Sequence, residues 1–262
     1  MSYDPHTSLE GRRVRHSFDR AATSYDQAAA LQRRVADRLL GLVDTAPAAI
    51  LDAGSGTGYG TALLQQRCSQ AVLYALDLAP AMLAATRARV GALPLVCADM
   101  QALPLADVSL DLLWSSLMLQ WCNRPDLAFS GAHRCLRPGG SFVFSTFGPS
   151  TLHELRASFS DGRTHVSNFP APAVLCRQLE QAGFVDIHME SAEEVLHYPD
   201  VRSLMLELKA IGAHNATAGR ARGLTGKRAW RAMLDNYETR RTEAGLPGTY
   251  GLIYVRARKA GG

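Results

Sequence analysis

Short apolar segments alternate with longer amphipathic segments along most of the chain. The apolar segments are bounded by turn residues and predict buried strands at 49–53, 71–77, 93–99, 109–116 and 141–147. Helical spacing of apolar residues predicts helices at 61–67, 127–136 and 172–183, and another that opens at Pro80. Strands and helices in this order form parallel βαβ units. The pattern therefore predicts a doubly wound, mostly parallel α/β sheet that binds ligands at the carboxyl ends of its strands.

Two helical regions interrupt this alternation. Residues 1–11 suggest a loose tail, and apolar residues then recur at helical spacing over 18–43. A second helical region, at 199–246, separates a strand at 184–190 from a last strand at 249–259. We expect both helical regions to cover the ligand edge of the sheet as a lid. The predicted division is a helical lid at 1–45, a core at 46–198, a helical insert at 199–246 and a closing strand at 247–262.

The composition is that of an ordinary globular protein, with 47% hydrophobic and 20% charged residues among 262. The formal net charge of +4 is too small to indicate a nucleic-acid partner. No apolar run is long enough for a membrane span, and the N-terminal segment lacks the apolar core of a secretory signal. The five cysteines are scattered, without a C-x-x-C pair, which is typical of reduced thiols. We expect a cytoplasmic protein without membrane contact.

The segment LDAGSGTG follows the first predicted strand and carries spaced glycines. A dinucleotide fingerprint requires glycine where Tyr59 or Thr61 stands, and a phosphate-binding P-loop is also broken at Tyr59. What is left is an acid, Asp52, followed by glycines at every second position. An acid at a strand end suits an ammonium group, and bare glycine backbone can pack against a ligand that has no phosphates.

Two more acids, Asp77 and Asp99, end the next two predicted strands. A carboxylate at Asp77 can bind ribose hydroxyls through two charge-assisted hydrogen bonds, as it does in NAD-binding folds. With the glycine turn and the segments LDLLWSSLMLQW and LRPGGSFVFST, these acids resemble the motifs of class I S-adenosylmethionine-dependent methyltransferases. The resemblance implies a Rossmann-like fold in which Asp99 meets the adenine amino group and Met100 covers the ring. It implies these cofactor-binding residues: Asp52, Gly54, Ser55, Gly56, Gly58, Asp77, Leu78, Asp99, Met100 and Ser116.

The sequence also restricts the methyl acceptor. Methylation of adenine or amide nitrogen predicts an Asp, Asn or Ser followed by two prolines and an aromatic residue, where this chain has SSLMLQW. No cysteine pair indicates RNA cytosine methylation, and no HExxH motif or clustered His and Cys spacing indicates a metal. We therefore expect no nucleic-acid substrate and no metal.

The chain resembles one class of these enzymes more closely, the malonyl-acyl-carrier-protein O-methyltransferases of biotin synthesis. The segments that carry the resemblance include FDRAATSYDQAAALQ, ALDLAPAML, LKAIGAHNATAGRARGLTGKR at 208–228 and GLPGTYGLIYVRARK. It implies methylation of the free carboxylate of a malonyl thioester on an acyl carrier protein, with S-adenosylhomocysteine as coproduct, for the pimeloyl stage of the pathway. Trans-aconitate-type and quinone-pathway methyltransferases share the first half of these segments. A free carboxylic acid or quinone precursor is therefore the alternative acceptor, and a nucleic-acid-binding protein with a relict cofactor domain is the alternative of a different class.

A carboxylate acceptor is ionised at neutral pH and needs no general base, so the site has to align it and exclude water. The residues expected to border the methyl group are Tyr25 on the lid and Gln120 and Trp121 after the fourth strand. Those expected to hold the substrate are Lys209, Arg220, Phe169 and His153, and His165 lies near His153 in sequence. Each of these side chains also has a structural interpretation, as lid or core packing for the aromatic residues and as solvated surface for the charged residues and histidines.

Basic residues cluster in two regions. No acid occurs between Lys209 and Leu234, and several arginines precede the first predicted helix or open it. Acyl carrier proteins are small and acidic, so a basic rim beside the cavity would attract them, less strongly at high salt. We predict that this rim contains Arg222, Lys227, Arg228, Arg231, Arg12 and Arg13. Binding of nucleic acid would call for more stacking aromatic residues than the insert has, and an ordinary arginine-rich surface is the simplest alternative.

Overall fold

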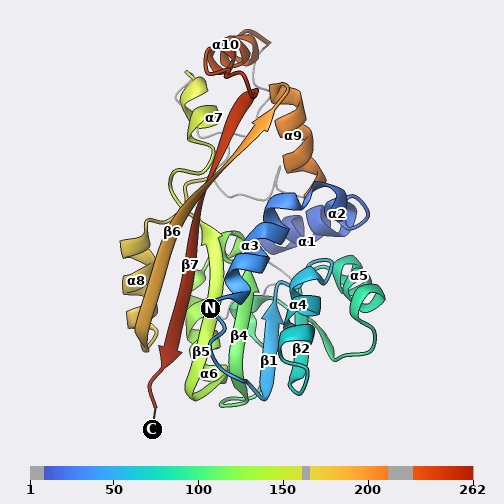
Figure 1. The fold of residues 1–262 in the computed structure, drawn as a ribbon, viewed down its shortest axis with the longest axis vertical. Coiled ribbons are helices and arrows are strands. Elements are labelled where there is room, and N and C mark those ends of the chain that lie inside the picture. Colours follow the sequence, from blue (N-terminus) through green and yellow to red (C-terminus); the bar gives the residue numbers. More distant parts are fainter. Residues whose placement is uncertain (1–8, 161–165, 212–226, 262) are drawn as a thin grey trace.

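The structure is a computed structural model that describes residues 9–160, 166–211 and 227–261. In these ranges the strands form one seven-stranded sheet in the order β3-β2-β1-β4-β5-β7-β6 (Figure 1). Strands β1 to β5 are mutually parallel, and β7 is antiparallel to both β5 and β6. The strands are β1 (Ala49–Ala53), β2 (Val72–Asp77), β3 (Leu95–Cys97), β4 (Leu110–Ser116), β5 (Leu136–Phe147), β6 (Phe184–Tyr198) and β7 (Leu246–Lys259).

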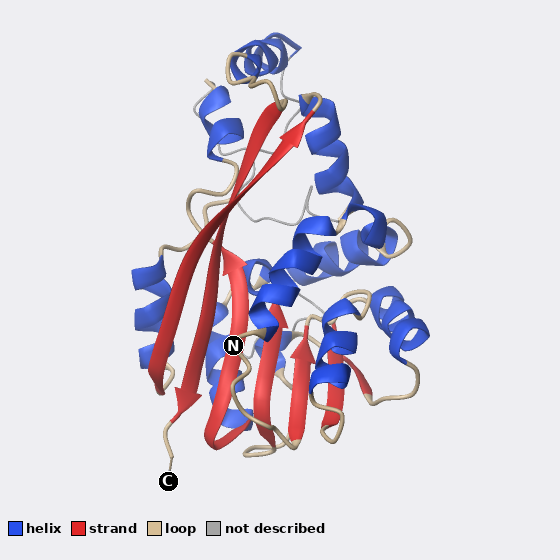
Figure 2. Cartoon of the chain, viewed as in Figure 1, coloured by secondary structure: helices blue, strands red, loops and turns tan. Residues whose placement is uncertain are grey.

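Helices cover both faces of the sheet (Figure 2). Along each central strand, successive side chains enter two different apolar clusters, as Leu112 and Leu113 do in β4. One cluster packs against α3 (Ala30–Leu40) and α4 (Tyr59–Arg67), and the other against α6 (Pro125–Cys135) and α8 (Pro172–Gln181). Helix α5 (Pro80–Val90) connects β2 to β3. The predicted doubly wound α/β fold is confirmed, with its strand order reversing between β1 and β4.

The N-terminal region differs from the prediction. The first helix, α1 (Leu9–Ala21), begins inside the segment that suggests a loose tail, so that expectation is wrong from Leu9 onward. The single helix expected over 18–43 is also wrong, because α2 (Tyr25–Ala28) and α3 follow as separate helices. Ser24 explains the first break, since its hydroxyl donates to the carbonyl of Ala21 and competes with the helix backbone.

The last two strands are longer than the sequence pattern indicates. Strand β6 was expected over 184–190 but continues to Tyr198, because β7 supplies backbone partners along its whole length. The extra residues carry the hairpin beyond the rest of the sheet, where helices α7 (His153–Ser158), α9 (Val201–Ala210) and α10 (Lys227–Glu238) surround it (Figure 1). Helices α9 and α10 occupy part of the predicted insert at 199–246.

Candidate active site

A cavity lies at the carboxyl edge of the parallel strands and continues into the extension built by the paired strands β6 and β7. Including its open mouth, it encloses about 1760 Å³. Its walls come from the lid, the glycine turn and the ends of β2 to β5 on one side, and from α7, α9 and β7 on the other.

The glycine turn forms the wall at one end. Gly54 and Gly56 line the cavity with positive φ angles of 82° and 54°, which favour glycine. A Cβ on Gly54 would lie 2.4 Å from the Met118 side chain, whereas one on Gly56 would meet nothing within 4 Å. The turn thus brings bare backbone to the cavity surface at Gly56, as the sequence predicts for a closely packed ligand.

Asp77 lines the cavity and also fixes the glycine turn. Its Oδ2 accepts a hydrogen bond from the Gly56 backbone N–H at 2.9 Å, and its Oδ1 accepts one from Ala79 at 2.8 Å. Burial raises its pKa to about 6, against the effect of these backbone donors. Asp99 and Met100 line the same end, and Asp99 accepts from the Gln101 backbone at 2.8 Å. The two predicted acids therefore face one space.

Asp52 does not line the cavity, so its predicted contact with a ligand ammonium group needs correction. Its side chain is fully buried, its Oδ2 accepts from the Thr61 hydroxyl at 2.5 Å, and its Oδ1 has no partner. Burial raises its pKa to about 7. The sequence placed the acid correctly at the strand end, but the alternation of side chains directs it behind the glycine turn, toward α4.

Ser55 and Gly58 are likewise absent from the cavity wall and shape the turn from behind. The Ser55 hydroxyl lies 3.3 Å from that of Thr86. Gly58 caps α4 with a φ of 84°, and a Cβ there would approach the Thr86 backbone to 2.9 Å. Leu78 and Ser116 line the cavity, as predicted for cofactor-binding residues.

The three residues expected to border the reacting group all line the cavity: Tyr25, Gln120 and Trp121. Phe18 joins the lid to this group, with ring centroids 6.5 Å from Tyr25 and 5.3 Å from Trp121. Burial, followed by the charges of Asp77 and Asp26, raises the pKa of Tyr25, so its phenol stays protonated.

Protein partners fix the Gln120 amide. Its Nε2 donates to the Leu117 carbonyl at 2.5 Å, and its Oε1 accepts from Thr146 at 3.4 Å. Its orientation is therefore set before any ligand binds.

A polar latch that the sequence analysis missed holds the lid against the glycine turn. Asp26 accepts from the Thr57 hydroxyl at 2.5 Å and pairs with Arg89. Arg89 also donates from Nε to the Thr57 carbonyl at 2.9 Å. These contacts fix α2, and with it Tyr25, over the cavity. No motif marks them, because the partners lie 31 and 63 residues from Asp26.

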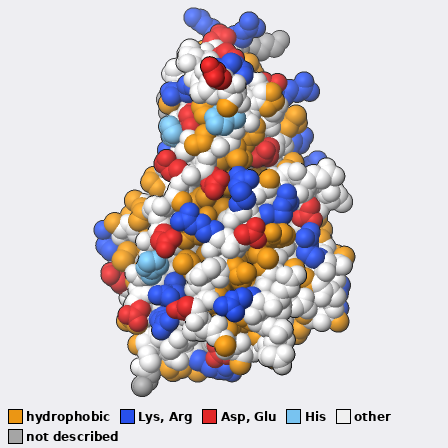
Figure 3. Space-filling model, viewed as in Figure 1, with side chains coloured by type: hydrophobic (Ala, Val, Ile, Leu, Met, Phe, Trp, Pro, Cys, Tyr) orange, Lys and Arg blue, Asp and Glu red, His pale blue; other side chains and the backbone are white. Residues whose placement is uncertain are grey.

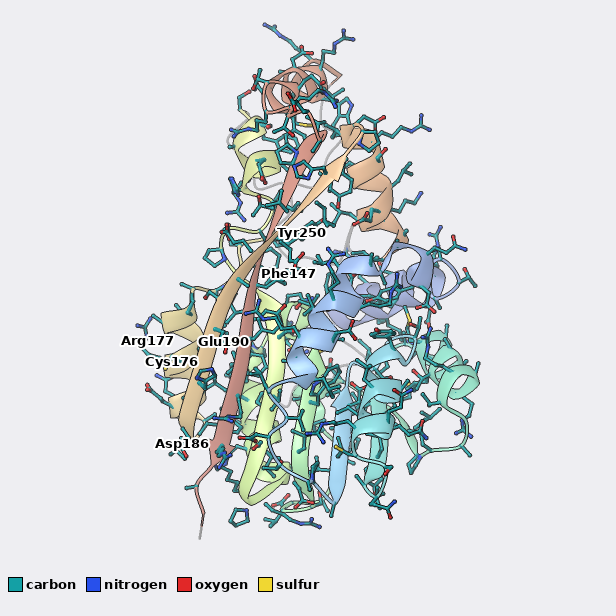
Figure 4. The ribbon with its side chains drawn as sticks, viewed as in Figure 1. Phe147, Cys176, Arg177, Asp186, Glu190 and Tyr250 are labelled. Carbon is teal, nitrogen blue, oxygen red and sulfur yellow. The ribbon has the colours of Figure 1, made fainter. Side chains whose placement is uncertain are left out.

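The opposite end of the cavity, here called the distal lobe, is mostly apolar. Its wall includes Phe147, Leu152, Leu155, Phe159, Val166, Phe169, Met205, Leu208, Ile211 and Tyr250, together with the polar residues Thr151 and Ser167. Phe169 was predicted, and its ring centroid lies 5.4 Å from that of Phe147 (labelled in Figure 4). Among the lining residues in the described part of the chain, Asp77 and Asp99 carry the only formal charges.

Two of the residues predicted to hold the substrate, Lys209 and His153, are not found on this wall. Lys209 is exposed at the end of α9 and does not line the cavity, and His153 is also exposed, with its Nδ1 3.1 Å from the Ser150 carbonyl oxygen. Both assignments need correction: helix α9 turns Met205 and Leu208 inward and leaves Lys209 outside. Arg220 and His165 lie outside the described residues.

The residues predicted for the basic rim are partly described. Arg12 and Arg13 are exposed on α1, and Arg228 and Arg231 are exposed on α10. Lys and Arg side chains gather over α10 at the upper end of the view in Figure 3. Arg222 lies outside the described residues, and of Lys227 the structure describes only the backbone at the start of α10.

Gln32 is a second residue that the sequence analysis missed. It lines the cavity from α3, and its Oε1 is buried without a hydrogen-bond partner. A buried acceptor in this state is expected to meet a donor on a ligand. In the sequence, Gln32 looks like the other polar residues of this helix, except that it follows the core residue Leu31. That difference is too small to mark Gln32 as a residue of the site.

Two searches of the described residues gave negative findings. No group of three or more His, Cys, Asp or Glu side chains there could hold a metal ion. No helix in the described ranges is long and apolar enough to cross a membrane.

The fold resembles that of known methyltransferases. Residues 51–144 match the Methyltransf_11 family, a methyltransferase domain. The YcgJ protein of Bacillus subtilis has a TM-score of 0.63 at 11% identity, covering 87% of this chain and 99% of that one. The Haemonchus contortus phosphoethanolamine N-methyltransferase 2, solved with S-adenosylhomocysteine, has a TM-score of 0.57 at 18% identity, covering 92% of this chain and 57% of that one. At such identities the likeness concerns the fold alone.

Sequence comparison is more specific. A malonyl-acyl-carrier-protein O-methyltransferase of Laribacter hongkongensis is 49% identical over 94% of this chain and 88% of its own length. One from Dechloromonas aromatica is 45% identical over 94% of both chains. With identity at this level over nearly the whole length of both proteins, the chain belongs to the malonyl-acyl-carrier-protein O-methyltransferase family.

Proposed function

We propose that this protein transfers the methyl group of S-adenosylmethionine to the free carboxylate of a malonyl thioester carried by an acyl carrier protein. The product is a methyl ester, which hides the charged end of the chain so that fatty-acid enzymes can extend it toward the pimeloyl stage of biotin synthesis. The observation that carries the proposal is a single cavity that joins the glycine turn and its acids to a long apolar lobe, in a chain of this family.

The residues at the glycine-turn end fit this cofactor. The exposed backbone of Gly56 can pack against the methionine portion, Asp77 can accept from two ribose hydroxyls, and Asp99 and Met100 suit the adenine. The buried Oε1 of Gln32 offers an acceptor to the ammonium group. When bound, S-adenosylmethionine supplies a methyl group activated by positively charged sulfur.

The chain's own contribution is to align the acceptor and keep water out. Tyr25 stays protonated, so it borders the reacting group as a wall and hydrogen-bond donor and does not act as a base. The carboxylate needs no base, since it is ionised at neutral pH. Its charge and that of the sulfonium cancel as the bond forms, and a dry apolar lobe favours such a step.

The described wall offers neutral donors to the carboxylate. Neutral donors orient a carboxylate without holding it tightly in the ground state, which would add nothing to the rate. Tyr25 and the second N–H of Gln120 are the donors that we assign to this role.

We place the carrier protein at the exposed basic side chains of α1 and α10. Arg12 and Arg13 on the first helix and Arg228 and Arg231 on the second are free of the apolar core and suit an acidic partner. The proposed rim also includes Lys227 at the start of α10 and Arg222, which lies outside the described residues.

Mass spectrometry tests the proposal directly. Malonyl-carrier protein incubated with enzyme and S-adenosylmethionine should gain the mass of one methyl group, and mild base should remove it as an ester. Free malonate and malonyl-coenzyme A serve as competing acceptors. Equal rates on free malonate would contradict the carrier-protein assignment and favour a methyltransferase of small acids.

A further inference from the structure

Strand β7 contributes a polar side chain, Tyr250, to the wall of the distal lobe. It is 3% exposed, and its ring centroid lies 6.0 Å from that of Phe147. Both side chains are labelled in Figure 4. Its hydroxyl lies 3.0 Å from that of Tyr198 at the end of β6. The Tyr198 hydroxyl in turn donates to Glu207 Oε1 on α9 at 2.9 Å. Three elements therefore meet in one hydrogen-bonded chain that ends at Tyr250 on the cavity wall, with Tyr198 and Glu207 outside the lining.

The direction of this chain follows from counting protons. A hydroxyl has one proton, and Tyr198 gives its own to Glu207, so the proton between the two tyrosines comes from Tyr250. The structure has the Tyr198 hydroxyl as donor and Glu207 Oε1 as acceptor, although burial raises the pKa of Glu207 against the opposing effects of the Tyr198 hydroxyl and the charge of Arg34. Tyr250 therefore has no proton left for a ligand. It offers the cavity lone pairs and acts there as a hydrogen-bond acceptor.

The sheet register shows which part of the substrate comes near Tyr250. Ser116 pairs with Ser145, and Phe147 pairs with Leu252, so Tyr250 lies two strands from β4 and four residues beyond the level of Ser116. At about 4.8 Å per strand and about 3.3 Å per residue, the two Cα atoms are about 16 Å apart. A malonyl thioester on a cysteamine arm extends about 8 Å from carboxylate oxygen to amide nitrogen, over seven bonds at about 1.2 Å per bond.

We infer that Tyr250 is a specificity-determining residue that accepts the N–H of the amide two methylenes from the thioester sulfur, and that Tyr198 and Glu207 are positioning residues that fix its direction. The inference rests on the proposed function. With the carboxylate placed beside the end of β4, where Gln120 is assigned as its donor, the tyrosine side chain spans most of the remaining distance, so the amide of the arm, and not the malonyl head, is within its reach. An acceptor would repel the malonyl carboxylate, which agrees with placing the arm here.

A pair of small substrates isolates this hydrogen bond. One is the malonyl thioester of N-acetylcysteamine, and the other is that of 2-acetoxyethanethiol, in which an ester oxygen replaces the amide N–H. With S-adenosylhomocysteine present, calorimetry on the wild-type protein should show the amide compound binding about 3- to 10-fold more tightly, the effect of one neutral hydrogen bond. In Tyr250→Phe this preference should disappear, because the affinity for the amide compound should fall while that for the ester compound stays the same.

Two more variants distinguish a positioning role of Tyr198 from general damage to the fold. Tyr198→Phe removes the acceptor that fixes the Tyr250 O–H. The Tyr250 hydroxyl can then rotate, and the preference for the amide compound should decrease. Tyr254→Phe is the matched control, because Tyr254 is a buried tyrosine of the same strand that does not line the cavity, and it should keep the full preference. In methylation assays the loss should be in KM, with kcat retained.

Absence of an amide preference in the wild-type protein would overturn the inference, and this comparison needs no variant. So would a Tyr250→Phe variant that weakens both compounds equally. Failure of the proposed function looks different: the amide preference in binding would be present, but no malonyl thioester would gain a methyl group.

Discussion

The two ends of the cavity are built in different ways. At the cofactor end, the wall consists of short segments that each follow a parallel strand, and its polar atoms are held by nearby backbone, as Asp77 is by Gly56 and Ala79. At the distal lobe, the wall comes from α7, α9, β7 and a loop, and its residues are apolar apart from a few hydroxyls such as that of Tyr250. Because the lining of one end is polar and that of the other is mostly apolar, we expect the first end to hold its ligand through directed hydrogen bonds and the second to select its ligand mainly through shape, with Tyr250 as a polar contact.

Removal of the Asp77 carboxylate should give the largest effect, because it would remove two hydrogen bonds to a charged group and a support of the glycine turn. We expect Asp77→Ala to raise the Kd for S-adenosylhomocysteine by about 100-fold or more, at about 1.5–3 kcal/mol for each such bond. Asp99→Ala should raise it by about 10-fold. Calorimetry measures both, and the reverse order would show that the ribose assignment is wrong.

A larger side chain in the distal lobe should weaken substrate binding without changing cofactor binding. Leu208 lines the lobe from α9, so Leu208→Trp should raise the KM for malonyl-carrier protein by at least about 10-fold through steric exclusion, with the Kd for S-adenosylhomocysteine unchanged. Leu206→Trp is the matched control, because Leu206 is 53% exposed on the same helix. If the Leu208 variant lost cofactor binding instead, the two ends would not be independent.

The cofactor end should also respond to pH. The pKa of Asp77 is raised to about 6, and the ionised form is the one that accepts from ribose. Affinity for S-adenosylhomocysteine should therefore be constant above this value and fall about tenfold per pH unit below it. Binding isotherms between pH 5 and 8 test this, and Asp77→Asn should flatten the profile. A wild-type profile flat down to pH 5 would place the titrating group elsewhere.

The basic rim should give the smallest effect, since exposed charges are screened by solvent. Arg228→Glu should raise the KM for malonyl-carrier protein by about threefold at low ionic strength and much less at high salt. Arg67→Glu, at the exposed end of α4, is a control away from the cavity. An effect of the Arg228 change that does not vary with salt would argue against electrostatic attraction.

The cofactor end was predictable because chain-local spacing decides it. A glycine turn directly after β1 and acids directly after β2 and β3 must lie together once the strands are parallel, so Gly54, Asp77 and Asp99 were correctly placed on one wall. Asp52 was not, because a shift of one residue along a strand moves a side chain to the other face. Spacing identifies the strand end but not the face on which the last side chain lies.

The sequence by itself therefore determined the fold, the family and most residues at the glycine-turn end. Only the tertiary structure decided the distal lobe, the Asp26 latch on the lid and the exposure of Lys209. The physical reason is separation along the chain. The walls at Phe147, Met205 and Tyr250 belong to one cavity because β6 and β7 extend past the rest of the sheet together. No local sequence pattern encodes how far two paired strands continue, or which face of the following helix α9 points into the cavity.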